Sequence, residues 1–367
     1  MIFNNRLPTE RAHGLQIVKM CSAFAEAGID VELIIPDIYN PIKESIFAHY
    51  QVKNNFSVSK KWCLSWKGNY RLKYLTFIIS LLFSGISKDR FVFTRHPEIV
   101  FLFSRLGYKV IFELHNWRAE RQARNIFLLK KVFLIIATTE IIRQEFIKSG
   151  FAPERIVVAP NGVELEDLNL KFNKDEILAK LGLPAGRIII LYAGHLYRQK
   201  GIYTIVEAAK SLPDKYHFVF IGGLPFDVEK LKQAAAENRN VEIRGPKKYT
   251  EVPYYLKAAD MLIIANSGAD ETEKKYTSPL KLFEYLAAGK VIIASRVPAI
   301  EEFLNEKVAV FFEPDNAQSL IKAIEEIDRE PEKQNILINN SLELVKNYTW
   351  QSRIQKIINF IKSRESH

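Results

Sequence analysis

The chain has 367 residues, and its 52 Lys and Arg against 42 Asp and Glu give a formal net charge of +10. Hydrophobic residues at 48% and charged residues at 26% are globular values, which exclude a wholly disordered chain, and the length predicts two domains. Cys21 and Cys63 are the only cysteines, which excludes a disulfide scaffold or a cysteine-rich zinc site and favours a reducing, cytoplasmic location.

Short apolar runs in the first half of the chain predict buried strands. Met1–Asn5 is barely long enough for a first strand, so we expect that edge of the sheet to be short or truncated. Further strands are expected at Val31–Pro36, Arg90–Thr94, Lys109–Leu114, Val132–Thr138 and Ile156–Ala159. Apolar side chains at helical spacing predict helices over 14–27, 97–106 and 139–149.

Neither a leader nor a membrane-spanning helix is expected. Met1–Arg11 is polar and has no apolar centre. The longest apolar run, Leu75–Ile86, is about twelve residues long, and a spanning helix needs roughly twenty. We therefore expect a chain that is soluble, or at most peripheral on the cytoplasmic face of a membrane.

The positive charge is concentrated in residues 51–131, which hold 16 basic and 4 acidic groups. Aromatic side chains alternate with these lysines and arginines, namely Trp62, Trp66, Tyr70, Tyr74, Phe77 and Phe83. This mixture is typical of a surface that contacts anionic lipid. In the alternative interpretation, 72–86 is an ordinary buried helix flanked by solvated lysines such as Lys67.

The second half repeats the alternation of strands and helices. Strands are expected at Arg187–Ala193, His217–Ile221, Val241–Ile243, Met261–Ala265, Val291–Ser295 and Val308–Phe311. Such alternation predicts α/β domains with parallel, doubly wound sheets. We expect one domain over 1–165, a second over 166–348, and a final helix within 349–367 that crosses back to the first. The cleft between two such domains is the default active site.

Several common signatures are absent from the sequence. It contains no G-x-G-x-x-G and no G-x-x-x-x-G-K-[S/T], which disfavours a standard dinucleotide fold and a P-loop enzyme. It also lacks H-E-x-x-H, C-x-x-C and G-x-S-x-G, so metal-dependent or serine hydrolysis has no support.

The segment Tyr276–Lys290 predicts a helix that starts at a proline and ends at a glycine. Pro279 is expected at the first helical position, and Gly289 stops the helix before the next strand. Because its first turn holds no acid, the free N–H groups could bind a diphosphate, with Glu284 placed to accept hydrogen bonds from a ribose. The alternative is a capped core helix with one polar residue.

The segment Tyr192–Gly201 follows a strand and carries two cations, Arg198 and Lys200, before the next helix. Cations at the carboxyl end of a sheet can neutralise a leaving group, although a solvated basic loop is the simpler interpretation.

Three further segments carry candidate residues. Pro160-Asn161-Gly162-Val163 predicts a tight turn at the joint between the domains. His115 follows an expected strand in Glu113-Leu114-His115-Asn116, where a structural role is the alternative. Gly14 closes the loop that starts at Pro8 and includes Glu10, and it could let the backbone approach a ligand.

Together these segments resemble the retaining family-4 glycosyltransferases of the GT-B fold, in which two Rossmann-like domains face a central cleft. The likeness covers nearly the whole chain, includes Gly222-Gly223 and the closing Tyr348-Thr349-Trp350, and follows the family's order. It implies transfer of a sugar from a nucleotide-diphosphate sugar to an acceptor hydroxyl, without a metal or other cofactor. The acceptor would be a glycan or glycolipid, as in polysaccharide or lipopolysaccharide synthesis.

The resemblance also implies roles for individual residues. Lys200 would contact the donor diphosphate with help from Arg198, and His115 would lie near the transferred sugar. Glu284 matches the second acid of the family's paired-glutamate motif and would bind the ribose, and the N–H groups of Leu280 and Lys281 would bind phosphate. The other donor-binding candidates are Tyr276, Ser278, Gly14, Gly194, Gly222, Gly245 and Lys247, the last two in the segment expected to line the nucleobase pocket.

The sequence departs from the family pattern at two positions. Tyr276 stands where the first glutamate usually lies, eight residues before Glu284, so the identity of the sugar does not carry over. His195 replaces the arginine often found after the loop glycine, and Arg198 would supply that charge.

Three alternative functions remain open. A GT-B sugar-nucleotide epimerase or an inactive nucleotide-sugar binder would share the fold. A nucleic-acid-binding protein would suit the net charge, but it leaves the Lys200 and Glu284 segments without a role, so no nucleic acid is expected.

Overall fold

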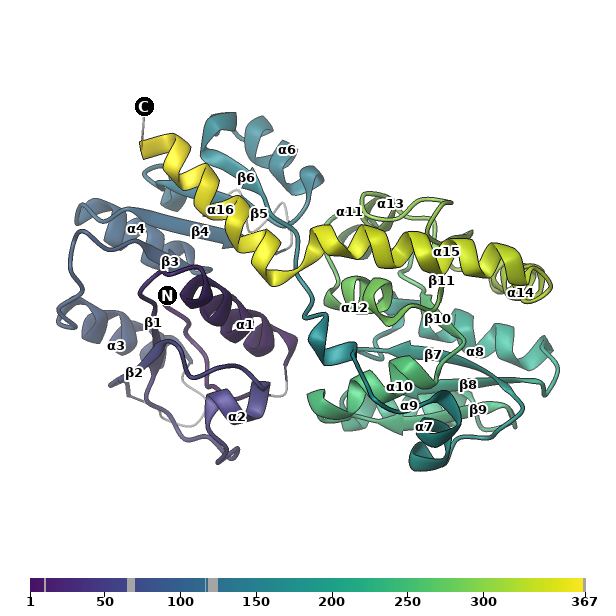
Figure 1. Ribbon diagram of the computed structural model, residues 1–367. Helices are drawn as coiled ribbons and strands as arrows, with labels where there is room; N and C mark the ends of the chain where they lie inside the picture. The colour runs from purple at the N-terminus through teal and green to yellow at the C-terminus, as the bar shows by residue number, and fades with distance from the viewer. Residues whose placement is uncertain (10, 65–69, 116, 118–124, 366–367) are drawn as a thin grey trace. The chain divides into compact units, whose positions relative to one another are not determined.

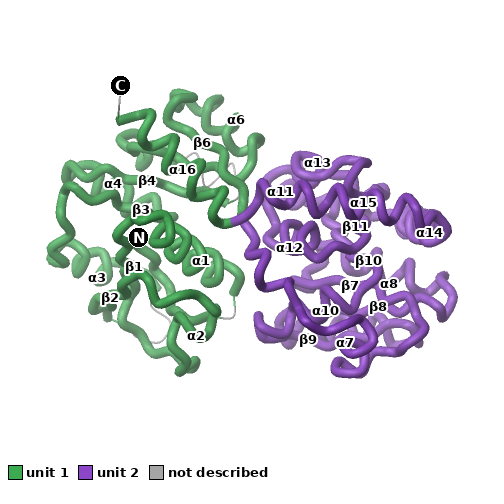
Figure 2. Tube along the Cα trace, in the orientation of Figure 1, with its two compact units in different colours: residues 1–161, 350–367 green, residues 162–349 purple. Residues whose placement is uncertain are grey.

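The computed structural model describes residues 1–9, 11–64, 70–115, 117 and 125–365. Its two compact units are shown in Figures 1 and 2. Unit 1 comprises Met1–Asn161 and Trp350–His367, and unit 2 comprises Gly162–Thr349. The expected domain limits were 165 and 348, a few residues from these. Glu10, Trp66, Lys67 and Asn116 lie outside the described residues.

Unit 1 is built on a parallel sheet. Its strands are β1 (Glu32–Pro36), β2 (Ser57–Lys61), β3 (Val92–Thr94), β4 (Val110–Leu114), β5 (Leu134–Ala137) and β6 (Ile156–Val158). β1 pairs with β2, and the other four pair in the order β3-β4-β5-β6. β2 was not predicted, because Ser-Val-Ser-Lys-Lys is polar and this strand has no buried residue.

The N-terminal segment joins these two sets of strands. Ile2 forms parallel bridges to Ile34 of β1 and to Thr94 of β3. Its amide donates to Phe93 O at 2.8 Å, and the next amide, of Phe3, donates to Ile34 O at 3.0 Å. The segment is short, as expected, since only Ile2 forms bridges. It lies between β1 and β3 and not at an edge of the sheet, so the expected edge position was wrong. Its two neighbours are distant in sequence, which local patterns do not reveal.

Six labelled helices belong to unit 1. They are α1 (Ala12–Glu26), α2 (Ile46–Tyr50), α3 (Tyr70–Leu82), α4 (Pro97–Arg105), α6 (Glu140–Lys148) and α16 (Trp350–Glu365). The C-terminal helix α16 packs against α1, as Figure 1 shows. No helix in the described ranges is long and apolar enough to cross a membrane.

Unit 2 has one six-stranded parallel sheet in the order β12-β11-β10-β7-β8-β9. The strands are β7 (Ile188–Ala193), β8 (Tyr216–Ile221), β9 (Val241–Gly245), β10 (Met261–Ile264), β11 (Val291–Ser295) and β12 (Val310–Phe312). All six coincide with expected strands to within two residues. Chain order reverses between β7 and β10, and ligands of doubly wound sheets bind at the carboxyl ends of the strands beside such a reversal.

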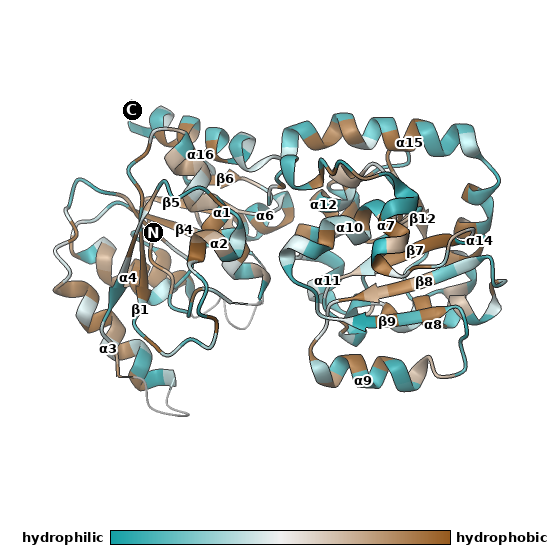
Figure 3. Ribbon diagram, turned by 60° about the horizontal axis from the view of Figure 1, so that its bottom comes forward, coloured by the Kyte–Doolittle hydropathy of each residue, from teal (hydrophilic) through white to brown (hydrophobic). Residues whose placement is uncertain are grey.

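Helices cover both faces of this sheet. They are α7 (Lys174–Leu181), α8 (Ile202–Ser211), α9 (Pro225–Ala234), α10 (Val252–Ala258), α11 (Glu271–Lys275), α12 (Leu280–Ala288), α13 (Pro298–Glu301), α14 (Ala317–Asp328) and α15 (Pro331–Leu344). Alternate strand residues enter two separate apolar clusters, and β7, in the middle of the sheet, is largely brown in Figure 3.

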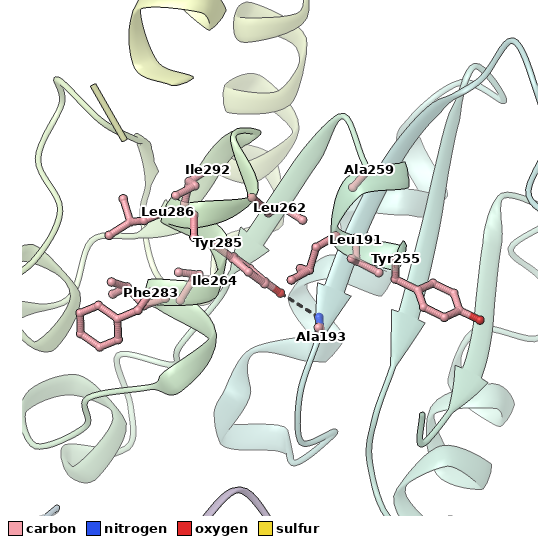
Figure 4. Close-up of a cluster of buried hydrophobic side chains, with 14 of the residues drawn as sticks. Leu191, Ala193, Tyr255, Ala259, Leu262, Ile264, Phe283, Tyr285, Leu286 and Ile292 are labelled. Atoms are coloured by element: carbon pink, nitrogen blue, oxygen red, sulfur yellow. Dashed lines mark hydrogen bonds between the residues drawn. The ribbon is translucent and has the colours of Figure 1, made fainter. Parts of the chain in front are cut away.

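One hydrogen bond fixes α12 against the end of β7. The Tyr285 hydroxyl accepts from the Ala193 amide at 2.8 Å inside one apolar cluster (Figure 4). The start of α12 is thereby held close to the loop that follows β7, which is where the candidate site lies.

Candidate functional site

Three glycines lie side by side at the carboxyl edge of the unit 2 sheet. Gly194 and Gly222 follow β7 and β8, and Gly245 ends β9; their φ angles are +142°, +104° and +65°. The Gly194 amide donates to Ile221 O at 3.0 Å, and the Gly222 amide donates to Gly245 O at 2.8 Å. A Cβ at Gly222 would lie only 2.2 Å from Gly194 O. The edge is therefore formed by backbone, which a ligand can approach closely.

Lys200 is held beside this edge by a carboxylate that sequence reasoning missed. Its Nζ lies 2.6 Å from Oε2 of Glu273, which α11 supplies, and both side chains are largely buried. Asn266, just after β10, donates to the same oxygen at 2.9 Å. Neither Glu273 nor Asn266 belongs to a recognisable motif, and only their spatial proximity to Lys200 marks them as part of the site.

Arg198, the other cation of this loop, is exposed and forms no ion pair with any described residue. The loop then ends at Gly201, which has a φ of +67° and is the N-cap of α8. Lys200 and Arg198 thus differ, since one is fixed by a counter-charge and the other faces solvent.

The start of α12 has no capping side chain and no acid in its first turn. The helix begins at Leu280 with Pro279 as N-cap, one position from the expected start, because Pro279 has an extended ψ of 130°. Ser278 is buried and Tyr276 is half-buried just before it. The N–H groups of Leu280 and Lys281 lie in the uncapped first turn, where the helix dipole favours an anion.

The side chain of Lys281 has an unexpected position. It is 9% exposed, and its Nζ has no hydrogen-bond partner among the described residues. Nζ lies 3.9 Å from the centre of the Tyr192 ring, and a Cβ at Gly194 would be 3.8 Å from it. Burial, followed by the nearby charge of Lys200, lowers the pKa of Lys281 well below its usual value.

Glu284 lies one turn further along α12 and lines a small pocket with Tyr249 and Asp167. The Tyr249 hydroxyl donates to Asp167 Oδ2 at 2.6 Å, and burial together with the charge of Glu284 raises the Tyr249 pKa. The segment after β9 therefore meets Glu284. Lys247 belongs to the same segment, and its ammonium lies 5.7 Å from the centre of the Tyr255 ring.

In unit 1, the ends of β3 and β4 carry a buried ionic cluster around Glu113. Its Oε1 lies 2.5 Å from Nη2 of Arg353 in α16, and its Oε2 lies 3.2 Å from Nη2 of Arg95. Burial raises the pKa of Glu113, but Arg95, His115 and Arg353 outweigh it, so the carboxyl stays ionised well below its usual range. Sequence analysis identified neither arginine.

His115 belongs to this cluster as a neutral imidazole. Its Nε2 lies 2.8 Å from Glu113 Oε1, outside the direction of a hydrogen bond, and Gln16 Nε2 is 3.2 Å from its Nδ1. Burial, followed by the charge of Arg95, lowers the His115 pKa to about 4. Gln16 also donates to Asn161, so the turn at the domain joint meets the same cluster.

Gly14 has an intramolecular reason to be glycine. A Cβ there would lie 2.3 Å from Tyr50 Oη and 2.4 Å from Thr9 Cγ2. The Tyr50 hydroxyl accepts from the Thr9 amide at 2.8 Å, which fixes this packing. The chain's own side chains therefore occupy the space above Gly14.

The basic segment 51–131 is partly neutralised within unit 1. Internal ion pairs join Lys53 to Glu26, Arg90 to Asp30, Arg95 to Glu113 and Lys109 to Glu365. Other cations of the segment form no ion pair within the described residues: Lys60, Lys61, Arg71 and Lys88.

Helix α3, beside these cations, is buried on one face and exposed on another. Phe77 and Leu81 are buried, which agrees in part with the buried-helix alternative. Leu75, Ile79 and Leu82 are exposed at helical spacing, and Phe83 directly after them is 84% exposed.

Comparisons with known proteins cover nearly all of the chain. The family model described as Glycosyltransferase Family 4 matches residues 14–167, and the one described as Glycosyl transferases group 1 matches residues 173–344.

Curated relatives carry names from polysaccharide synthesis. The chain is 27% identical over 199 residues to the putative teichuronic acid biosynthesis glycosyltransferase TuaC of Bacillus subtilis. The matched residues cover 54% of this chain and 47% of that protein. It is 28% identical over 188 residues to the putative colanic acid biosynthesis glycosyl transferase WcaI of Escherichia coli, or 48% of this chain and 45% of that protein. The chain spans about half the length of the curated relatives it matches.

Solved structures match the chain over nearly its full length. HepE of Anabaena, solved in complex with UDP and glucose, has a TM-score of 0.79 at 14% identity and covers 99% of both chains. Sucrose-phosphate synthase of Thermosynechococcus elongatus has a TM-score of 0.77 at 18% identity, over 97% of this chain and 94% of that one. These likenesses concern the fold, and they confirm the expected GT-B class.

Proposed function

The chain belongs to the family-4 glycosyltransferases of the GT-B fold, and on that premise we propose that it transfers a sugar from a nucleotide-diphosphate sugar to an acceptor hydroxyl with retention of anomeric configuration. One observation carries the proposal. Lys200, the uncapped start of α12 and the glycine edge gather at the carboxyl ends of the unit 2 strands. Each of them suits a diphosphate, and their coincidence favours a donor site over a solvated basic loop.

Catalysis in this proposal rests on charge at the leaving diphosphate. As the bond to the sugar breaks, negative charge grows on the phosphate oxygens, and fixed positive groups stabilise it. Lys200 is pre-positioned by Glu273 and Asn266, so little side-chain entropy remains to be lost when the donor binds. Exposed Arg198 adds a second cation, and the chain's own cations serve in place of a metal ion.

The nucleoside is assigned to the pocket of Glu284 and Tyr249. Glu284, which lines this pocket with Tyr249, accepts from ribose hydroxyls. The preceding segment from Gly245 to Lys248 is assigned to the base. HepE, which shares the fold, was solved with UDP, so UDP-sugars are the first donors to try.

Unit 1 is assigned to the acceptor and to the transferred sugar. His115, neutral near pH 7, can exchange hydrogen bonds with sugar hydroxyls without placing a charge beside them. The names of the curated relatives favour a growing polysaccharide or a lipid-linked glycan as acceptor.

A membrane-bound acceptor fits the surface around α3. Exposed Leu75, Ile79 and Leu82 lie beside unpaired lysines, a combination that binds anionic lipid through apolar insertion and charge. We include peripheral contact with an anionic membrane in the proposal.

A thermal-shift screen tests the donor site. UDP-, GDP- and ADP-sugars are added separately, and a donor that binds the native state raises the melting temperature. We expect one of them to stabilise the wild-type chain by several degrees and to lose most of that effect in Glu284→Ala. No shift with any of the three would contradict the proposed donor site.

A further inference from the structure

The ammonium of Lys281 is a buried polar group that the proposed reaction does not yet use. Lys281 is the second residue of α12, and its Nζ lies close to the turn at Gly194 and within electrostatic reach of Lys200 and Glu273. A buried amine without hydrogen bonds costs free energy, and the cost grows with its charge. The adjacent Lys200 adds like-charge repulsion, and Glu273 is already engaged by Lys200 and Asn266.

The face of Tyr192 offsets this cost only in part. A cation 3.9 Å from an aromatic centre gains a modest amount of free energy but satisfies none of the three N–H donors. The Tyr192 hydroxyl donates to His195 O at 2.7 Å, and it accepts no hydrogen bond from the Lys281 amine. The buried amine of Lys281 thus lacks a hydrogen-bond partner among the described residues and lies at the uncapped start of α12.

We infer that the Lys281 side chain is a third diphosphate-binding cation, which joins Lys200, Arg198 and the first N–H groups of α12 in holding the donor. This inference rests on the proposed function and extends it, since sequence analysis assigned only the backbone of Lys281 to phosphate. An arriving diphosphate supplies the negative charge and the acceptors that the ammonium lacks.

Direct binding of inorganic pyrophosphate, measured by calorimetry, tests this role without reference to a base, a sugar or an acceptor. In Lys281→Met the stem is kept and the amine removed, and we expect pyrophosphate affinity to fall by at least about tenfold. Lys281→Arg, which keeps a cation, should stay within a few-fold of the wild type. Where Lys281→Met does not fold, Lys281→Gln takes its place with the same expectation.

Lys257 provides a matched control. It is a half-buried lysine of α10, and its Nζ donates to Ala288 O, at the C-terminal end of α12, at 3.1 Å. Lys257→Met should leave pyrophosphate affinity unchanged. Melting temperature without ligand adds a second readout, because removing an unsatisfied buried amine should raise it in Lys281→Met, whereas a purely structural contact with Tyr192 requires it to fall.

Three outcomes overturn the inference: a wild-type chain that does not bind pyrophosphate, an unchanged affinity in Lys281→Met, or an equal loss in Lys257→Met. The proposed function can fail separately. Loss of pyrophosphate binding in Lys281→Met, with no nucleotide-sugar turned over by the wild type, would refute the transferase and leave this site standing. Sugar transfer with unchanged pyrophosphate affinity would refute this site alone.

Discussion

At the scale of single residues, Glu113 shows how a buried charge ties the end of the chain to its first unit. Arg353 of α16 donates to Glu113 and to the carbonyls of Ala159 and Pro160, just before the turn at Asn161. Because Glu113 also meets His115, the position of α16 and the orientation of a candidate site residue depend on one carboxylate.

Removing Arg353 should destabilise unit 1 strongly. Arg353→Met leaves two carbonyls and a buried carboxylate short of a partner, and we expect a loss of about 3–5 kcal/mol in the free energy of unfolding. Arg364→Met on the same helix removes one bond to the Phe133 carbonyl at a less buried site and should cost under about 1 kcal/mol. Urea unfolding of both variants measures the difference, and equal losses would contradict the assigned role.

At the scale of elements, the candidate donor site is made by helix starts. α8 begins at Ile202, after its N-cap Gly201, and α12 begins at Leu280, both directly beside the ends of unit 2 strands. Gly201 has no room for a side chain, because a Cβ there would lie 1.7 Å from the Ala265 carbonyl oxygen. The close approach of α8 to β10 therefore depends on this glycine and sets where Lys200 lies.

Gly201 and Gly289 have nearly equal φ angles, so their alanine variants share the same backbone strain and differ in whether the new Cβ collides with a neighbour. Gly289, at +66°, would place a Cβ no closer than 3.5 Å to Leu342, whereas Gly201, at +67°, has the Ala265 clash. Gly289→Ala should cost about 1–2 kcal/mol. Gly201→Ala should cost clearly more, since backbone must move. Chemical unfolding compares them, and a Gly201 variant as stable as the Gly289 variant would disprove the tight packing.

Helix α3 should determine membrane contact. Replacing Leu75, Ile79 and Leu82 together by Ser removes exposed apolar area without touching the buried face, so the melting temperature should not change. Cosedimentation with anionic phosphatidylglycerol vesicles should weaken by roughly tenfold or more. The membrane proposal fails if the wild type does not sediment with these vesicles, or if the variant sediments equally well.

Elements with strong local patterns were predictable, and those that depend on distant partners were not. Five of the unit 2 strands are mainly apolar runs that are visible in the sequence, and β9 (Val-Glu-Ile-Arg-Gly) alternates apolar and charged residues. β2 is polar, so no apolar run marks it as a strand. The N-terminal segment is positioned by its bridges to Ile34 and Thr94, which are distant in sequence, so its place in the sheet does not follow from the local pattern. At the site, Lys200 and Glu284 belong to motifs, whereas Glu273 becomes relevant only through a contact 73 residues away in sequence.

At the scale of the whole molecule, the two units should respond differently to acid. Burial is the leading cause that lowers the pKa of His13, His96 and His115 to about 4, and all three belong to unit 1. Between pH 6.5, the ordinary histidine pKa, and about pH 4, these three histidines bind protons in the unfolded chain but not in the folded unit. The stability of unit 1 should therefore fall as pH drops through this window.

The tryptophans allow this to be measured. All four belong to unit 1, so their fluorescence reports the unfolding of that unit alone. The fluorescence-detected melting temperature should drop by several degrees or more from pH 7.5 to pH 5, and by more than any transition seen only by circular dichroism. A fluorescence midpoint that does not change over this range would contradict the prediction.

The most direct test of the proposed function is the release of nucleoside diphosphate from UDP-, GDP- and ADP-sugars in the presence of membrane lipid extract. We predict that the wild type consumes one of these donors, and that Lys200→Ala lowers its turnover by at least about a hundredfold while it melts as a folded protein. A folded Lys200→Ala variant that turns the donor over at the wild-type rate would contradict the proposal.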